Sequence, residues 1–263
     1  MGPYFYKLKT EIIIGLTYRF EVFATLLARY VQIVATVFLW ICVYQDRKSI
    51  HGMTREQMIT WMILSAGLSG LYVLDVPSRI SSGVRMGSIA VELIRPCSLP
   101  GLFCAQDIGQ TVDSFFSKFI PIVLLGGITF GLLPPAGAVS FILALISVGI
   151  GYFILWLMYD LVGTLCFRTM VLGQFDAVLR TVIAIFSGSM IPLAFFPQPM
   201  QQILAWMPFQ YTFQLPLGLY IGMISVREGL LQIGIQIIWL CILNMMTVIV
   251  WNRIRKYILI QGG

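Results

Sequence analysis

Hydrophobic and polar positions follow one another along the chain in long blocks, and most apolar blocks are far longer than a buried strand. A helix that crosses a bilayer needs about 20 mostly apolar residues. Six blocks meet this requirement, and we expect spanning helices near residues 23–44, 57–76, 115–133, 137–165, 178–196 and 230–251. The pattern predicts an all-α integral membrane protein with a single transmembrane domain over residues 1–263.

The fifth block runs into a stretch that no continuous helix can accommodate. Proline removes a backbone donor and clashes with the preceding helical turn. Inside a bilayer, irregular backbone persists only where protein or a water-filled cavity satisfies its polar groups. We therefore expect an outward-facing re-entrant helical hairpin over residues 195–222, before the last span. The residues that mark it are Pro192, Phe195, Phe196, Pro197, Pro208, Phe209 and Pro216.

The aromatic side chains of the same stretch leave two interpretations open. They could line an exit path for an amphipathic substrate, or they could form an aromatic belt at the outer membrane interface. The residues concerned are Trp206, Phe209, Tyr211, Phe213 and Tyr220.

The segment before the first span has the spacing of an amphipathic helix. On a helical projection Phe5, Leu8 and Ile12 share one arc, and Lys7 and Glu11 lie opposite. We predict a helix at the membrane surface within residues 1–22. The alternative is a frayed extension of the first span.

The distribution of lysine and arginine predicts the orientation, because these residues collect on the cytoplasmic side of membrane proteins. With six spans both termini share one side. That side holds most of the 17 basic residues, and the other holds only Arg47, Lys48, Arg55 and Arg227. We expect both termini in the cytoplasm of a cell-membrane protein, together with a cytoplasmic loop over residues 77–113.

Composition narrows the function classes. The chain is 59% hydrophobic and 11% charged with a mean hydropathy of +0.90, whereas soluble domains are about 45–50% apolar and about 25% charged. There is no polar segment long enough for a separate soluble domain of about 100 residues. The net charge of +6 is scattered between apolar runs, so no nucleic-acid partner is expected. The five cysteines form no CxxC pair, and we expect neither a disulfide nor a metal site.

The loop after the second span contains a short predicted helix that is apolar although it lies outside the spans. Ser88 can cap it, and Pro96 ends it because the residue before a proline avoids helical geometry. Such a helix either docks into a groove on a cytosolic protein or packs against the membrane or the chain itself. Its candidate contact residues are Ser88, Ile89, Val91, Glu92, Leu93, Ile94 and Arg95.

Two motifs together resemble the permease subunits of ABC transporters of the type 2 export class, in particular the small six-span subfamily with a separately encoded ATPase. They are Gly87-Ser-Ile-Ala-Val-Glu-Leu-Ile-Arg-Pro after the second span, and Ser187-Gly-Ser-Met-Ile-Pro-Leu-Ala-Phe-Phe-Pro with Met207-Pro-Phe before the last. The amphipathic start and the six spans extend the resemblance over nearly the whole chain.

The resemblance implies a role for each segment. Residues 88–94 would be the coupling helix that meets the ATPase, residues 1–22 the connecting helix, and residues 195–222 the outward re-entrant helices. The class often carries more charge in the coupling loop than Glu92 and Arg95 supply here. The working unit would contain a cytosolic ATPase dimer and a second permease chain, with a heteromeric pair preferred over a homodimer. Substrate would pass between the two permeases, along the first, second and fifth spans.

ATP hydrolysis is expected in the partner, with no cofactor in this chain. No GxxxxGK[ST] sequence occurs, and the paired glycines at Gly126-Gly127 and Gly149-Ile-Gly151 lie within spans, where small residues allow close helix packing. ATP and Mg²⁺ would therefore bind the ATPase.

Asp160 is the most notable ionisable residue within a span. An intramembrane carboxylate is costly and raises the hypothesis of a proton or cation site. Alternatively, Asp160 lies at the cytoplasmic interface and pairs with Arg168 or Arg180. Asp75 and Arg79, four residues apart, are expected to form a local pair.

Two other function classes are compatible with a polytopic membrane protein of this size. An ion-gradient-driven secondary transporter would use Asp160 and a broken helix near the midplane, but such transporters often show inverted repeats, and no convincing repeat relates residues 1–133 to 134–263. An intramembrane enzyme would need clustered catalytic side chains, and the spans offer only Asp160 and scattered serines.

Overall fold

The computed structural model describes residues 3–15, 19–45, 47–87, 98–169 and 173–261. Within these ranges the only strands are the two-residue β1 (Ser49–Ile50) and β2 (Met53–Thr54), which pair antiparallel, and almost all other regular structure is helical. Five helical segments are long and apolar enough to cross a membrane: Val22–Tyr44, Arg55–Arg85, Leu99–Phe130, Ala138–Thr164 and Val226–Ile254. The prediction of an all-α membrane protein is confirmed.

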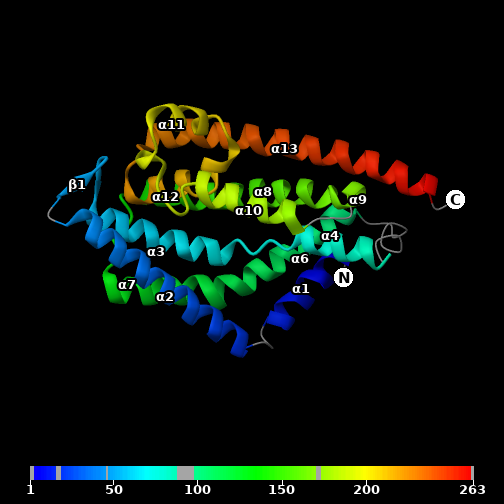
Figure 1. The fold of residues 1–263 in the computed structure, drawn as a ribbon, viewed down its shortest axis with the longest axis horizontal. Helices are drawn as coiled ribbons and strands as arrows, with labels where there is room; N and C mark the ends of the chain where they lie inside the picture. The colour runs from blue at the N-terminus through cyan, green and yellow to red at the C-terminus, as the bar shows by residue number, and fades with distance from the viewer. Residues whose placement is uncertain (1–2, 16–18, 46, 88–97, 170–172, 262–263) are drawn as a thin grey trace.

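The first half of the chain forms a helical layer along one long edge of the molecule (Figure 1). It contains α1 (Pro3–Gly15), α2 (Arg19–Tyr44), α3 (Arg55–Leu71) and α4 (Val76–Arg85). Helix α3 begins at Thr54, whose side chain accepts from the Gln57 backbone N–H while the Gln57 side chain accepts from the Thr54 N–H. This reciprocal capping fixes the start of the second span directly after the short hairpin.

The third long helix begins well before the predicted start at residue 115. It comprises α6 (Leu99–Ser114), a π-helical segment (Phe115–Phe119) and α7 (Ile120–Phe130). The predicted loop 77–113 is therefore helical at both ends, in α4 up to Arg85 and in α6 from Leu99 onward. Polar residues in α6, among them Gln106, Asp107 and Gln110, lowered the hydropathy and concealed the helix.

The second half of the chain lies against the first. It contains α8 (Ala138–Thr164), α9 (Cys166–Thr169), α10 (Gly173–Phe186), α11 (Gln198–Ala205), α12 (Gln214–Ile221) and α13 (Val226–Gln261). The predicted fourth span, 137–165, agrees with α8. The predicted fifth helix, 178–196, differs from α10, which ends at Phe186 after 14 residues.

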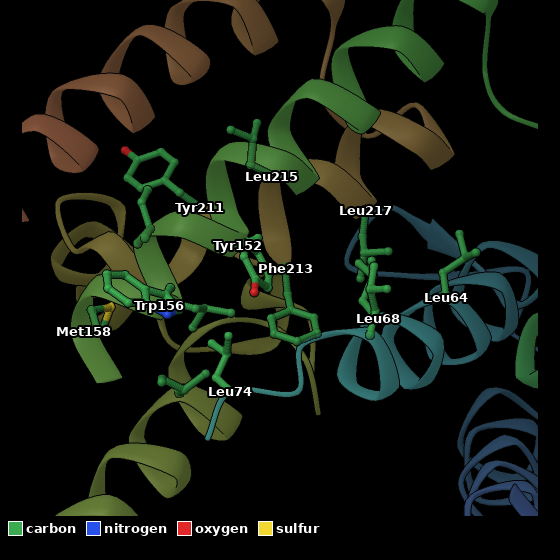
Figure 2. Packing of buried hydrophobic residues seen from close by; sticks show 14 of the residues in the cluster. Leu64, Leu68, Leu74, Tyr152, Trp156, Met158, Tyr211, Phe213, Leu215 and Leu217 are labelled. Atoms are coloured by element: carbon green, nitrogen blue, oxygen red, sulfur yellow. The ribbon is translucent and has the colours of Figure 1, made fainter. Parts of the chain in front are cut away.

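The core lies where α3, α8 and α12 meet. Helix α12 has a nearly fully buried surface, and Figure 2 shows Leu215 and Leu217 of this helix near side chains of α3 and α8. The Tyr72 ring approaches the Phe213 ring edge-on with centroids 5.3 Å apart. A short helix inserted between two long ones thus forms part of the centre of the fold.

Glycines bring α3 and α7 into close contact. A Cβ atom on Gly126 would lie 2.8 Å from the Cγ2 atom of Ile63, and one on Gly67 would lie 2.9 Å from Val123. Gly151 of α8 is equally constrained, because its Cβ would lie 3.0 Å from the Tyr211 carbonyl oxygen. The packing role predicted for Gly126 and Gly151 is confirmed, whereas Gly149 has open space around it.

Candidate functional site

The first functional feature is the broken segment between α10 and α13. After α10 the chain turns through Ser187–Ile191, forms a 3₁₀ turn (Leu193–Phe195), and then makes the short helices α11 and α12, joined through a second 3₁₀ turn (Pro208–Tyr211). The prediction that the apolar stretch cannot remain one helix is confirmed. In Figure 1, α11 lies beside α13 on the outside, and α12 lies beneath it next to α8.

Side chains of α3 satisfy the backbone at the beginning of this segment. The Trp61 indole N–H donates to the Gly188 carbonyl oxygen at 2.9 Å, and the Ser65 hydroxyl donates to the Ser189 carbonyl oxygen at 2.6 Å. Gly188 has a φ of +86°, a conformation that favours glycine. Irregular backbone buried in protein requires such partners.

Two glutamine side chains form hydrogen bonds with further backbone groups of the broken segment. The Gln214 side-chain oxygen accepts from the Leu193 N–H at 3.0 Å. The fully buried Gln236 of α13 donates through Nε2 to the carbonyl oxygens of Ser147 at 2.8 Å and Tyr211 at 2.9 Å. The polar residues of the neighbouring spans therefore hold this segment in place.

The part of the broken segment around α11 and the part that leads into α12 differ in exposure. Helix α11 leads into Trp206, which is 82% exposed, whereas Tyr211 and Phe213 are 1% and 4% exposed. Tyr211 and Phe213 are core residues, so neither an exit path nor an aromatic belt describes them. Among the residues predicted to mark the hairpin, Pro192 and Pro216 are buried, Phe195, Phe196, Pro208 and Phe209 are half-buried, and Pro197 is exposed.

The second functional feature is a buried charged cluster at the opposite end of the fold. Arg79 of α4 reaches Asp107 of α6 at 3.4 Å and Glu11 of α1 at 3.8 Å. Asp107 is fully buried, and its second oxygen accepts from the Trp156 indole N–H of α8 at 3.1 Å. The Arg79 guanidinium thus links α4 to α1 and α6, and the Trp156 indole connects α8 to the same cluster.

Helix α1 packs on α6 through the same cluster. Gln106 and Gln110 donate to the two carboxylate oxygens of Glu11 at 3.2 and 3.3 Å. Gly109 lies so close to α1 that a Cβ atom there would be 2.7 Å from the Leu8 carbonyl oxygen. Glu11, placed by the helical projection on the polar face, is directed toward α6, so this face makes tertiary contacts.

Two predicted ion pairs are wrong. Arg79 pairs with Glu11 and Asp107, and not with Asp75. Arg180 pairs with Asp176 at 2.9 Å and stands over the Tyr159 ring, and it makes no ion pair with Asp160. Arg79 pairs with residues that are distant in the chain. Arg180 pairs with the residue four positions before it in α10.

Asp160 is fully buried within the fold, close to the C-terminal end of α8. Its Oδ2 atom accepts from the Trp251 indole N–H of α13 at 2.8 Å, and its Oδ1 atom has no hydrogen-bond partner among the described residues. The other predicted partner, Arg168, lies outside the residues whose side chains are described. The role of Asp160 stays a hypothesis.

The predicted coupling residues, 88–95, lie outside the described residues. The described chain on either side leads to the charged cluster: α4 carries Arg79 and ends at Arg85, and Ser98 precedes α6. The Ser98 backbone N–H donates to the Tyr4 hydroxyl of α1 at 3.1 Å. Any force acting on residues 88–97 would therefore enter the fold beside this cluster.

Sequence reasoning missed the charged cluster for an identifiable reason. Glu11, Arg79 and Asp107 stand far apart in the chain, and each was assigned to a surface helix, a local pair or a loop. The available signal was the placement of Gln106, Asp107 and Gln110 on one face of a helix. Among the described residues, no group of three His, Cys, Asp or Glu side chains is placed to hold a metal ion.

Comparison with known proteins gives one informative result. A family profile described as "ABC-2 family transporter protein" matches residues 30–259. The match includes the first long apolar segment from residue 30 onward and the other four completely, together with the broken segment and Arg79, Asp107 and Asp160. A search of curated proteins gives no match.

Proposed function

Because the chain belongs to the ABC-2 family of transporter proteins, we propose that it is the permease subunit of an ATP-driven exporter whose ATPase is a separate cytosolic chain. The observation that carries this proposal is the family match over most of a chain that also lacks a GxxxxGK[ST] motif. ATP and Mg²⁺ would bind the partner, and this chain would form half of the path for the substrate.

The proposed topology has six crossings with both termini in the cytoplasm. Five helices are long enough by themselves, and α10, about 21 Å long at 1.5 Å per residue, is shorter than the roughly 30 Å hydrocarbon core. Arg180, midway along α10, contacts Tyr159 near the end of α8, whereas Gly188 just beyond α10 contacts Trp61 in the first half of α3. This course supports a sixth crossing by α10, completed by the irregular backbone after it.

In this topology the broken segment forms the outward re-entrant hairpin. The hydrogen bonds from Trp61, Ser65 and Gln236 meet the requirement that such backbone be satisfied by protein. The carbonyl oxygen of Ile221 also accepts from the Gln57 side chain at 3.3 Å, so the end of α12 lies beside the start of α3. That start follows the short β hairpin, which we assign to the outside.

Coupling is proposed to pass from residues 88–95 to the spans through the charged cluster. Arg79 lies on the helix that leads into this segment and is paired with both α1 and α6. Closure of the ATPase dimer would push on the segment and move α1, α4 and α6 together. Rigid-body motion of packed helices is an established way to switch such a protein between two openings.

A second permease chain is expected to pack against the first span. Helix α2 presents a continuous apolar stripe in which Phe23, Leu27 and Val31 are more than half exposed. Lipid or a second permease could cover this stripe. The resemblance stated above favours a related, separately encoded chain over an identical copy.

The coupling assignment is tested by the double variant I89D/L93D. Two carboxylates on the apolar face should abolish association with the ATPase, because charged side chains are poorly accommodated in an apolar groove. Co-purification of the ATPase with a tagged chain is the measurement, with size-exclusion elution and thermal unfolding of the variant as checks on its fold. Undiminished co-purification with a folded variant would disprove the coupling role.

The topology is tested by single cysteines in a cysteine-free background. Cysteines at positions 51 and 202 should react with an impermeant maleimide from outside, and one at position 257 should react only after permeabilisation. Labelling of both positions 51 and 257 from outside would place the two termini on opposite sides and require an odd number of crossings.

A further inference from the structure

A cavity opens between α6, α8 and α13, and one residue of its wall, Trp156, also contacts the charged cluster. Its volume is about 620 Å³, within the range of about 300–1,000 Å³ typical of small-molecule sites. Its walls are mostly apolar, from residues such as Phe153, Leu157, Leu240 and Val248. Polar side chains enter it from one stripe of α13, at Asn244, Thr247 and Asn252.

Two tryptophans in the wall share an unusual arrangement. Trp156 of α8 and Trp251 of α13 both line the cavity, and each donates its indole N–H to a fully buried carboxylate. Trp156 donates to Asp107 at 3.1 Å, and Trp251 donates to Asp160 at 2.8 Å. A carboxylate that accepts from an indole N–H increases the electron density of the ring, and tryptophan is the best aromatic partner for a cation.

Among the described residues, Arg79 is the only cation that forms an ion pair with either carboxylate behind these rings. Asp160 forms no ion pair with any described residue, and its Oδ1 atom has no hydrogen-bond partner there. Asp107 shares a single guanidinium, that of Arg79, with Glu11. Arg253 directly follows Asn252, which lines the cavity, but the Arg253 side chain is exposed and does not line it.

A polar group inside the cavity also lacks a partner. Thr247 is 4% exposed, lines the cavity, and its buried hydroxyl oxygen has no hydrogen-bond partner among the described residues. Buried polar atoms are normally paired. The unpartnered hydroxyl oxygen, an acceptor with two lone pairs, and the two indole side chains line the same cavity.

We propose that this cavity binds an organic cation with an apolar body, such as a quaternary ammonium or phosphonium ion. The apolar walls would hold the body, and the two tryptophan rings with the carboxylates behind them would attract the charge. The site goes beyond the proposed export function and does not rest on it. A lipid acyl chain, the neutral alternative, would need none of this charge arrangement.

The test compares two ions of matched shape and opposite charge, tetraphenylphosphonium and tetraphenylborate. Saturable binding of each is measured by equilibrium dialysis to the full chain in nanodiscs, with protein-free nanodiscs subtracted. We expect saturable binding of the cation and none of the anion. Equal binding of both, or no saturable binding of the cation, would overturn the proposal, and equal binding would indicate a site for neutral apolar ligands.

Two variants test separately the contribution of the Asp160 carboxylate and that of the cavity volume to cation binding. D160N removes the charge but keeps an oxygen that can accept from Trp251, and we expect cation binding on the order of tenfold weaker. C241F narrows the cavity from an exposed position in its wall and should also weaken binding. The control is E228Q, which removes a carboxylate from the far end of α13 and should leave binding unchanged. Cation binding that D160N leaves at the wild-type level would overturn the proposal.

Discussion

Replacement of Arg79 by methionine is the sharpest test of the charged cluster. Arg79 is the only described cation paired with Glu11 and Asp107, and Asp107 has no exposed surface. Removing one partner from a buried ion pair typically costs about 3–5 kcal/mol, because the other charge is left uncompensated. The distances of 3.4 and 3.8 Å are long for an ion pair, so we expect a value at the lower end, about 3 kcal/mol.

The assay for R79M is thermal unfolding of the chain in nanodiscs. At about 2–4 °C per kcal/mol for a chain of this size, a loss of about 3 kcal/mol corresponds to a decrease in Tm of roughly 6–12 °C. Methionine preserves much of the apolar length of the side chain, so the loss reports on charge more than on packing. The effect should be smaller at a pH low enough to protonate the carboxylates.

The double variant R79M/D107N provides the matched control. It removes the more deeply buried of the two carboxylates that R79M leaves without a cation, while the asparagine oxygen can still accept from the Trp156 indole. We expect it to recover at least half of the lost Tm, because coupled sites are non-additive. An R79M protein as stable as wild type, or a double variant less stable than R79M, would show that Arg79 does not compensate the charge of Asp107.

Two further predictions concern packing and the broken segment. G126A should lower the unfolding free energy by about 1–3 kcal/mol because its Cβ would meet Ile63 at 2.8 Å, whereas G149A, in open space, should leave stability unchanged or raise it by up to about 1 kcal/mol; thermal unfolding of the pair measures both. Q236L should cost about 2 kcal/mol by removing donors from two buried carbonyl oxygens, and hydrogen exchange should increase around Tyr211. Equal Tm values for the two glycine variants, or unchanged exchange in Q236L, would contradict these assignments.

The sequence was sufficient for the features that depend on local chemistry. Long apolar blocks fixed α2, α8 and α13, and the prolines between residues 192 and 216 located the break between α10 and α12. Both signals act within a few residues of the chain, since bilayer thickness sets helix length and proline geometry interrupts a helix. For that reason the fourth predicted span agreed closely with α8.

The remaining features depend on contacts between distant segments. Helix α6 looked like a loop because its polar residues face α1 and α4, and hydropathy cannot distinguish a polar face that meets another helix from one that meets water. Asp160 was expected near arginines in sequence, but its partner is Trp251, which lies 91 positions away. The spacing of Gln106, Asp107 and Gln110 indicates a polar helix face, but a single sequence does not reveal which distant residues that face or Asp160 contacts.

Affinity purification would show whether this permease works with a separate ATPase. The tagged chain would be purified from its native membrane in mild detergent, its partners identified by mass spectrometry, and the eluate assayed for ATP hydrolysis. We expect a co-eluting cytosolic ATPase whose activity disappears from the eluate of I89D/L93D. A homogeneous chain without ATPase in several detergents would contradict this expectation and favour an ion-coupled transporter, with Asp160 the first residue to neutralise.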